Sequence, residues 1–342
     1  MTRPVLLWGI STDGPLAVVR TALAEMGVPV VFVDQHAAPA TAIRLDVGEE
    51  MTGTLSTPTD DVALENVGAA YVRPYDLAKV LAVDGVSPGT ADWDRAVAIE
   101  DVLVSWSEMT AAFVVNRPSA MASNNSKPFQ AGLIRKLGFD VPDTLVTTDP
   151  DAAVHFWRRH GSVVYKSVSG VRSIVAQLGE SDRPRLNDIG NCPTQFQQYI
   201  AGVDLRVHVV GEEIFSCEVR SDGDDYRYPS RQGGSVAVTA CTLPEDVAHR
   251  CRVLATMLAL PVAGIDLRRT SSGAWFCFEV NPSPGFNYYE EETGLPIGAA
   301  IAQLLAAGAK GDQFQLTSLS ARKDPSAAEL LGSSQMVLTD IV

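Results

Sequence analysis

The sequence predicts a mixed α/β protein whose C-terminal half is built on antiparallel strands. The chain begins with a strand, a helix and a second strand, which is the pattern of a βαβ unit. Its second half contains several apolar strands with charged residues at alternating positions, two of them joined as a hairpin. At 342 residues, 46% of them hydrophobic, the chain is too long for one small core. We therefore expect two or three domains.

The composition excludes several classes of protein. A formal net charge of -14 argues against a general nucleic-acid binder, although it leaves local nucleotide binding open. The five cysteines are scattered, without C-x-x-C or a histidine at zinc spacing, and indicate reduced thiols. No apolar run has the length of a membrane span, and the N-terminus lacks the apolar segment of a signal peptide. We expect a cytoplasmic protein that contacts neither membrane nor nucleic acid.

The βαβ unit over residues 5–34 raises the question of a dinucleotide site. Gly9 and Gly14 follow the first strand, and Asp34 ends the second, where a ribose-binding acid would lie. The glycine spacing differs from the dinucleotide fingerprint, however, and Pro15 suits the first turn of a helix. We therefore favour a structural loop over a dinucleotide site.

A strand ending at Arg73 follows a polar stretch at residues 51–61 and precedes one long helix over residues 93–113. An arginine at a strand end can face a cleft and bind a charged substrate, or it can form a surface ion pair. The pattern does not decide between these two readings. We expect a first domain to end near residue 115.

Two oxygen-bearing side chains leave the strand over residues 275–278. Glu279 and Asn281 lie two positions apart and share one face of a strand. Residues 270–273 turn the preceding strand back as a hairpin, which brings Asp266 near Glu279. Mg²⁺ takes one or two carboxylates together with substrate phosphates. A glutamate that merely ends a strand is the alternative, but two acids on adjacent apolar strands need a compensating cation or basic group.

Two lysines stand out upstream. Lys127 opens a basic helix after a polar turn and by itself reads as a solvated lysine. Lys166 ends an apolar strand, and a lysine on a buried strand needs an anion. The strand over residues 196–200 has a backbone that can pair with a flat base. Charged residues then punctuate the next two strands: Asp204, Arg206 and Arg220. Charged residues at alternating positions are also normal on the solvated face of a sheet, so each of the three has a purely structural interpretation as well.

Taken in order, these features resemble the ATP-grasp ligases from about residue 116 to residue 305. The segments D-L-R, G-I-D-L-R and E-V-N-P-S-P-G are similar to those of the ligases that add glutamate to a ribosomal protein tail. The stretch over residues 71–73, the long helix and N-C-P-T-Q-F-Q-Q-Y-I look like the microviridin-type graspetide synthetases. Those enzymes cross-link side chains of ribosomally made peptides. The resemblance implies an N-terminal pre-ATP-grasp domain (1–115), a central subdomain (116–200), a C-terminal subdomain with the metal site (201–309) and a tail (310–342).

The resemblance also implies roles for individual residues. ATP would be bound by Lys127, Lys166, Gln198, Tyr199, Ile200 and Asp204, the lysines at the phosphates, residues 198–200 at the adenine and Asp204 at the ribose. Mg²⁺, or Mn²⁺, would be held by Asp266, Glu279 and Asn281. The γ-phosphate and its developing charge would be steadied by Arg206 and Arg220. Substrate contacts are expected from Arg73, Arg172, Tyr226, Arg227, Ser283 and Gly285. The family's glycine-rich flap is shortened here to V-S-G-V-R-S, where Arg172 would replace part of that lid.

The activity implied is an ATP-dependent ligase that activates a carboxylate as an acyl phosphate and joins it to an amine or hydroxyl. We favour a peptide substrate. A small-molecule or amino-acid ligase of a biosynthetic pathway is one alternative, and an inactive nucleotide-binding sensor or scaffold is another. The resemblance is also compatible with a homodimer.

Overall fold

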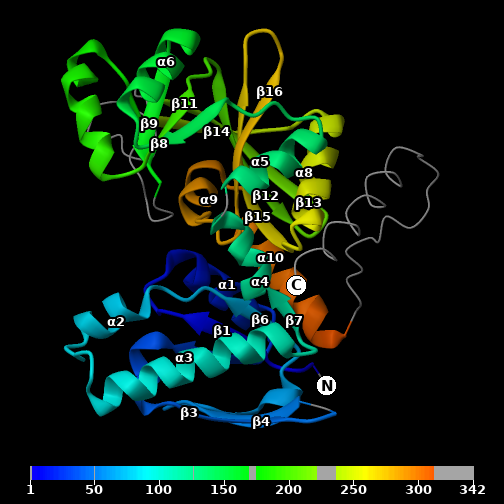
Figure 1. Cartoon of the computed structure of the whole chain (residues 1–342). Helices are drawn as coiled ribbons and strands as arrows, with labels where there is room; N and C mark the ends of the chain where they lie inside the picture. The colour runs from blue at the N-terminus through cyan, green and yellow to red at the C-terminus, as the bar shows by residue number, and fades with distance from the viewer. Residues whose placement is uncertain (1, 50, 126, 169–174, 222–235, 312–342) are drawn as a thin grey trace.

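The computed structural model describes residues 2–49, 51–125, 127–168, 175–221 and 236–311 (Figure 1). Within these ranges the strands form four sheets, one parallel and three antiparallel. None of the described helices combines the length and the apolar character that crossing a lipid bilayer requires.

The N-terminal sheet is parallel and has the order β2-β1-β6-β7. Its strands are β1 (Val5–Gly9), β2 (Val30–Asp34), β6 (Ala69–Val72) and β7 (Phe113–Val115). The helices of this region are α1 (Gly14–Glu25), α2 (Leu77–Val83) and α3 (Ala91–Met109), with the short 3₁₀ helices η1 (Gln35–Ala40) and η2 (Leu64–Asn66). β1 pairs directly with β2, which confirms the predicted βαβ unit. The predicted long helix stops at Met109, four residues early, because Phe113 already pairs with Ala69 in the sheet.

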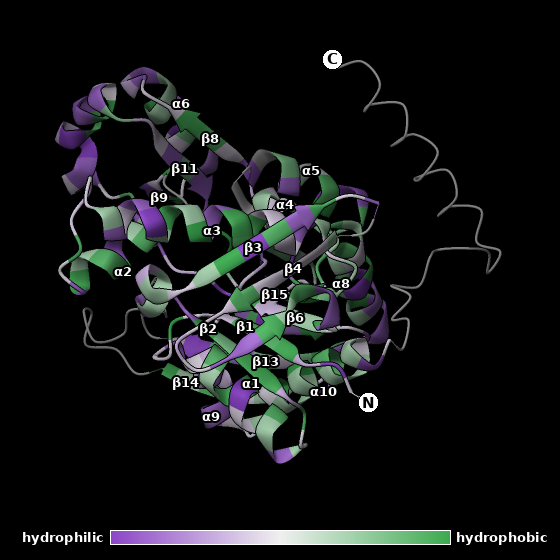
Figure 2. Ribbon diagram, turned by 90° about the horizontal axis from the view of Figure 1, so that it is seen from below, coloured by the Kyte–Doolittle hydropathy of each residue, from purple (hydrophilic) through white to green (hydrophobic). Residues whose placement is uncertain are grey.

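A small antiparallel sheet was not anticipated in the stretch around residues 51–61. It consists of β3 (Ala42–Val47), β4 (Met51–Ser56) and β5 (Asp61–Ala63). Leu55 is fully buried and belongs to the same apolar cluster as Trp8 and Trp106, whereas Thr54 beside it is exposed. Figure 2 shows the corresponding mixture of hydrophobic and hydrophilic residues along β3. Packing of one face on the N-terminal core therefore stabilises strands that look polar in sequence.

Helix α10 (Ile297–Lys310) belongs to the same core although it is the last described helix of the chain. Ile301 and Leu305 are fully buried in a cluster with Val5 and Leu7 of β1. A Cβ at Gly308 would come within 2.6 Å of the Phe113 ring, so α10 approaches the sheet too closely for a larger residue. Figure 1 shows α10 between the N-terminal sheet and the C-terminal one.

The central sheet is antiparallel, with the order β10-β9-β11-β8. Its strands are β8 (Thr144–Thr147), β9 (Val163–Ser167), β10 (Ala176–Gln177) and β11 (Thr194–Gln198). Helix α6 (Pro150–His160) and the 3₁₀ segment η4 (Glu180–Asn191) accompany it. Val163, Leu186 and Phe196 form the buried cluster on the face toward these helices. The side chains that alternate with them, Lys166 among them, lie on the other face.

The C-terminal sheet is also antiparallel and has the order β14-β13-β12-β15-β16. Its strands are β12 (Val203–Val210), β13 (Glu213–Ser221), β14 (Val236–Cys241), β15 (Val262–Arg269) and β16 (Trp275–Asn281). The accompanying helices are α4 (Pro118–Met121), η3 (Ala122–Asn125), α5 (Lys127–Lys136), α8 (Glu245–Met257) and α9 (Asn287–Thr293). Val207, Ile265 and Val280 pack with Leu254 of α8 and Ile134 of α5 in one buried cluster. The opposite face of this sheet carries Asp204, Arg206, Asp266 and Arg268.

Candidate active site

Two D-x-R segments face each other on neighbouring strands and form a charge ladder, Asp204, Arg206, Asp266 and Arg268. β12 and β15 are antiparallel, so Arg206 lies opposite Asp266 and Asp204 lies opposite Arg268. Arg206 donates a hydrogen bond to Asp266, and its side chain is only 8% exposed. Arg268 grips Asp204 with Nε at 2.6 Å and Nη2 at 2.9 Å. Two charge-assisted pairs of opposite polarity therefore lie side by side on the polar face.

The second carboxylate of the predicted metal site stands beside the first. Glu279 is the cross-strand partner of Asp266, which confirms that the hairpin brings these two residues together. Lys127, at the start of α5, donates from Nζ to Glu279 Oε2 over 2.5 Å. A lysine and an arginine thus compensate the two carboxylates, which would otherwise repel each other on adjacent strands.

A bulge in β16 decides which way these side chains point. The pairing shifts between Asp266 and Leu267, so that Glu279 and Cys277 face the two consecutive residues of β15. Cys277 is fully buried in the apolar cluster, and burial raises the pKa of its thiol well above the ordinary value. Glu279 remains on the polar face. Bulges often re-aim a side chain in this way beside an active site.

Two buried amide side chains hold the end of β16, and neither was singled out in the sequence. Gln130 of α5 donates to the Val280 carbonyl at 2.9 Å and accepts from the Val280 N–H at 3.2 Å. Asn116 donates to the carbonyls of Val262 and Pro282 at 2.7 Å and 2.5 Å. The only signal available for Gln130 is its position three residues after Lys127, on the same side of α5. These contacts fix the backbone at Val280 and Pro282, directly after Glu279 and on both sides of Asn281.

Arg73 is buried. The interpretation of Arg73 as half of a surface ion pair is therefore wrong. Its Nε donates to Asp13 Oδ2 at 2.6 Å, and the two side chains are 8% and 2% exposed. Burial opposes its charge, but Tyr71 and Asp13 together raise the pKa of Arg73 above the ordinary value. Arg73 Nη1 also donates to Ser283 Oγ and to the Pro284 carbonyl, at 3.0 Å and 3.1 Å. It therefore joins the N-terminal sheet to the loop that follows Asn281.

The loop that follows Asn281 is also contacted by side chains of the C-terminal sheet. The Asn281 Oδ1 atom accepts from the Ser283 N–H at 3.0 Å. His208 Nε2 lies 3.4 Å from the Gly285 carbonyl, and burial together with nearby Arg206 lowers the pKa of His208 to about 3. A neutral imidazole can donate this one hydrogen bond. Ser283 and Gly285, predicted as substrate contacts, are therefore part of a tightly held loop beside the candidate metal ligands.

The predicted nucleotide-binding residues of the central region lie where β11 leads into β12. The N–H groups of Gln198 and Tyr199 donate to the carbonyls of Asp143 and Ser162, at 2.9 Å and 3.0 Å. The Ile200 carbonyl accepts from Arg268 Nη1 at 2.7 Å. We call residues 198–200 the hinge segment, because they connect the central and C-terminal sheets.

The structure does not bring Arg220 to this site. Arg206 lies opposite Cys217, so Cys217 and Val219 share its face of the sheet and Arg220 points to the other side. Its side chain is 74% exposed and pairs with Glu218. This position gives no support to the predicted role of Arg220 at the γ-phosphate. Arg172, Tyr226, Arg227 and the tail beyond residue 311 lie outside the described residues.

The donors on this face fit Mg²⁺. Asp266 and Glu279 supply carboxylate oxygens on adjacent strands, and Asn281 supplies an amide oxygen on the same face. No group of three His, Cys, Asp or Glu side chains suitable for a metal occurs among the described residues. A hard cation that completes its shell with phosphate oxygens suits two carboxylates and an amide, whereas zinc sites are built mainly from Cys and His ligands.

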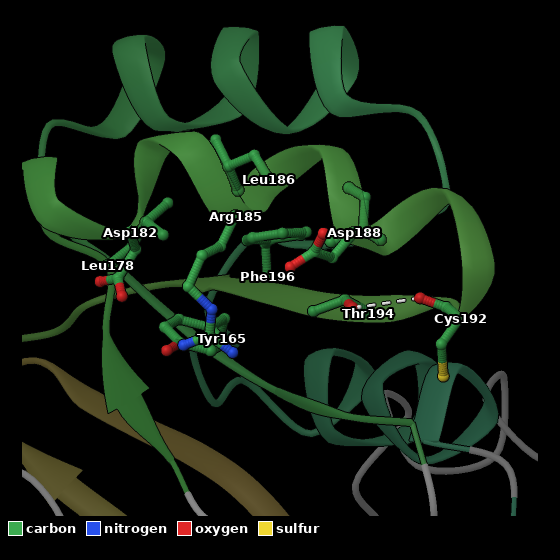
Figure 3. Close-up of a pocket in the computed structure, with 10 residues that line it drawn as sticks. Tyr165, Leu178, Asp182, Arg185, Leu186, Asp188, Cys192, Thr194 and Phe196 are labelled. Carbon is green, nitrogen blue, oxygen red and sulfur yellow. Dashed lines mark hydrogen bonds between the residues drawn. The ribbon is translucent and has the colours of Figure 1, made fainter.

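A separate cavity of about 170 Å³ lies between η4 and the central sheet. Figure 3 shows Tyr165, Phe196 and Arg185 around it, together with the hydrogen bond from Thr194 to the Cys192 carbonyl. Tyr165 and Phe196 project from the face of β9 and β11 opposite to Lys166. The cavity is therefore not continuous with the lysine side of the sheet.

Comparison with known proteins agrees with this geometry. A model described as a RimK-like ATP-grasp domain matches residues 122–305. The chain is 31% identical over 205 residues to the ribosomal protein bS6-L-glutamate ligases of Escherichia coli K12 and Shigella boydii, which covers 57% of this chain and 67% of theirs.

Solved structures extend the likeness to the N-terminal sheet. The Chryseobacterium gregarium RiPP-associated ATP-grasp ligase, in complex with ADP and a leader and core peptide, has a TM-score of 0.76 at 22% identity and covers 89% of this chain and 96% of its own. The macrocyclase MdnC bound with precursor peptide MdnA, from Microcystis aeruginosa, has a TM-score of 0.74 at 22% identity and covers 88% and 99%. The predicted ATP-grasp fold is confirmed.

Proposed function

The chain belongs to the RimK-like ATP-grasp family, whose members are ATP- and Mg²⁺-dependent ligases, and we propose from this premise that it modifies a peptide. In this proposal a peptide carboxylate attacks the γ-phosphate of ATP, which gives an acyl phosphate and ADP. An amine or hydroxyl then attacks the acyl carbon and displaces phosphate. The observation that carries the proposal is the meeting of Lys127, Glu279, Asp266 and Arg206 on one face of the C-terminal sheet.

The charges on this face suit phosphoryl transfer. Bound Mg²⁺ would neutralise charge on the transferring phosphoryl group, and Asp266, Glu279 and Asn281 are the residues that would hold it. Lys127 contacts Glu279 directly, so its ammonium group lies beside the metal ligands, where a triphosphate would meet it. Arg206 is buried and fixed by Asp266, so its guanidinium is held in place before the reaction begins.

The base would lie at the hinge segment. Because the N–H groups of Gln198 and Tyr199 are used within the protein, the backbone contacts to adenine would come from the carbonyls of this segment and from the Ile200 N–H. Lys166 lies on the face of the central sheet opposite the buried cluster that contains Val163 and Phe196, and we assign it to the phosphates. A peptide is preferred as substrate because the fold likeness to peptide-bound ligases spans nearly nine-tenths of the chain.

The test measures ADP and phosphate formation from ATP and Mg²⁺, with and without peptides encoded beside the gene. Peptide-dependent ADP formation, with a product one water lighter than its parts, would support the proposal. A matched pair of variants locates the chemistry: Glu279→Gln should abolish turnover, while Arg220→Gln on the opposite face should leave it near the parent level.

Two other outcomes would overturn the proposal. If free amino acids are joined and peptides are not, the protein is a small-molecule ligase. If ATP binds, no acceptor stimulates turnover, and Glu279→Gln behaves as the parent does, the protein is a nucleotide-binding sensor.

A further inference from the structure

Arg268 connects the hinge segment to the charge ladder. Its Nε and Nη2 atoms bind the two oxygens of Asp204, and its Nη1 atom donates to the Ile200 carbonyl at 2.7 Å. The side chain is 16% exposed, and all three of its nitrogens are used within the protein. Planar bidentate binding of this kind is specific to arginine, because a lysine offers a single point charge.

Two aromatic rings hold the guanidinium in this position. Its central carbon lies 5.8 Å from the centre of the Tyr199 ring and 5.1 Å from that of the Phe278 ring. Tyr199 belongs to the hinge segment, and Phe278 is the extra residue of the β16 bulge. The same bulge that keeps Glu279 on the polar face therefore also supplies a ring for Arg268.

The position of Arg268 on its strand relates the two ends of the nucleotide site. Asp266 and Arg268 are two residues apart on β15 and share a face. About 7 Å therefore separates Asp266, the candidate metal ligand, from Arg268, which binds the hinge segment. The intervening Leu267 is buried in the core, which keeps this strand rigid. The spacing between the metal end and the base end of the site is thus set by one strand.

We propose that Arg268 is a positioning residue for the nucleotide base: it holds the Ile200 carbonyl and the hinge segment in the conformation that binds the base. This inference rests on the proposed function, because it requires that the hinge segment receive the base of ATP. It assigns Arg268 no contact with the phosphates or the reacting atoms. Loss of Arg268 should therefore weaken binding of the nucleoside part of ATP, to which the hinge segment and Asp204 are assigned, and leave binding of the phosphates unchanged.

The experiment compares Arg268→Met with Arg269→Met. Arg269 is the next residue on the same strand, but it points to the other face, where it pairs with Glu218 and lies over Trp275. Calorimetry would measure binding of the non-hydrolysable ATP analogue AMPPNP and of inorganic tripolyphosphate, each with Mg²⁺. Arg268→Met should lose affinity for the nucleotide about tenfold or more, which is typical for a hydrogen bond to a charged group. Its affinity for tripolyphosphate should stay within twofold of the parent, and Arg269→Met should match the parent for both ligands.

Steady-state kinetics provide a second readout. A positioning role for the base predicts a raised KM for ATP with kcat within about twofold of the parent. If Arg268→Met does not fold, Arg268→Lys is used instead, because it retains the charge between the two rings and loses the bidentate grip on Asp204. The same selective loss of nucleotide affinity is expected, smaller in size.

The results that overturn the inference differ from those that overturn the proposed function. Unchanged nucleotide affinity in Arg268→Met, or equal loss for nucleotide and tripolyphosphate, would show that Arg268 has only a general structural role. Failure of the parent protein itself to bind AMPPNP with Mg²⁺ would instead remove the proposed function.

Discussion

The buried pair of Asp13 and Arg73 allows a sharp test of how the N-terminal sheet is joined to the loop that follows Asn281. The perturbation is Asp13→Asn, which keeps the shape of the side chain and removes its charge. The Asp13 carboxylate accepts hydrogen bonds from Arg73 and from the Tyr75 hydroxyl, the latter at 2.9 Å. It also accepts from the Leu16 N–H at the start of α1. After the change, the Arg73 guanidinium stays in place without a counter-charge.

The expected loss follows from the burial of both partners. Side-chain exposures of 8% and 2% mean that water cannot replace the missing carboxylate. Removing one member of a buried ion pair costs about 3–5 kcal/mol, and the amide oxygen of Asn retains part of the hydrogen bonding. We therefore expect a fall of about 3 kcal/mol in the free energy of unfolding. A double variant, Asp13→Asn with Arg73→Met, should lose less than the single one, because no uncompensated charge remains.

The assay is equilibrium unfolding in urea at pH 7, followed by circular dichroism. Asp46→Asn provides the matched control, since Asp46 also pairs with an arginine, Arg44, but both side chains are more than half exposed. Exposed pairs contribute little, so this control should unfold as the parent does. Should Asp13→Asn match the parent as well, or should the double variant be weaker than the single one, the reasoning from burial would be refuted.

Three further predictions concern the C-terminal sheet. Gln130→Leu leaves the backbone groups of Val280 without their buried partner and should lower the free energy of unfolding by about 1–3 kcal/mol; an unchanged urea midpoint would contradict this. The folded-state pKa of His208 is lowered to about 3, so the unfolded chain takes up the proton first and stability falls as the pH drops below about 6.5. Relative to His208→Asn, the parent should lose about 1.4 kcal/mol per pH unit from pH 6 to pH 4, and parallel pH profiles of the two proteins would argue against a buried neutral imidazole. Glu279→Gln should lower the rate of ADP formation at least about 100-fold while Arg220→Gln changes it less than twofold, and equal losses in both would place Arg220 back at the site.

The sequence was sufficient for features that depend on local repeats. The turn at residues 270–273 predicted that Asp266 lies near Glu279, and the register confirms this by pairing the two residues directly. The βαβ unit was likewise readable from an apolar strand, a capped helix and a second strand. These features involve neighbours along the chain, whose geometry is set by backbone period and turn chemistry.

Face assignments were less secure, since a single irregularity reverses them. A strict period of two would place Cys277 on the same face as Glu279, but the bulge at Phe278 turns Cys277 into the core. Arg220 carries the same kind of charge as Arg206 and also lies on a sheet strand, yet the register of β12 against β13 directs it to the opposite face. Strand pairing had to be known before either residue could be assigned.

Contacts between distant parts of the chain were decided by the tertiary structure alone. Lys127 meets Glu279 across 152 positions, Gln130 meets Val280 across 150, and Arg73 meets Ser283 across 210. The sequence by itself determined the ATP-grasp family and the hairpin that carries the acids, because motifs and backbone periods are local. Only the tertiary structure decided which buried cations and amides compensate and hold those acids, because that depends on how helices and sheets from separate regions pack against one another.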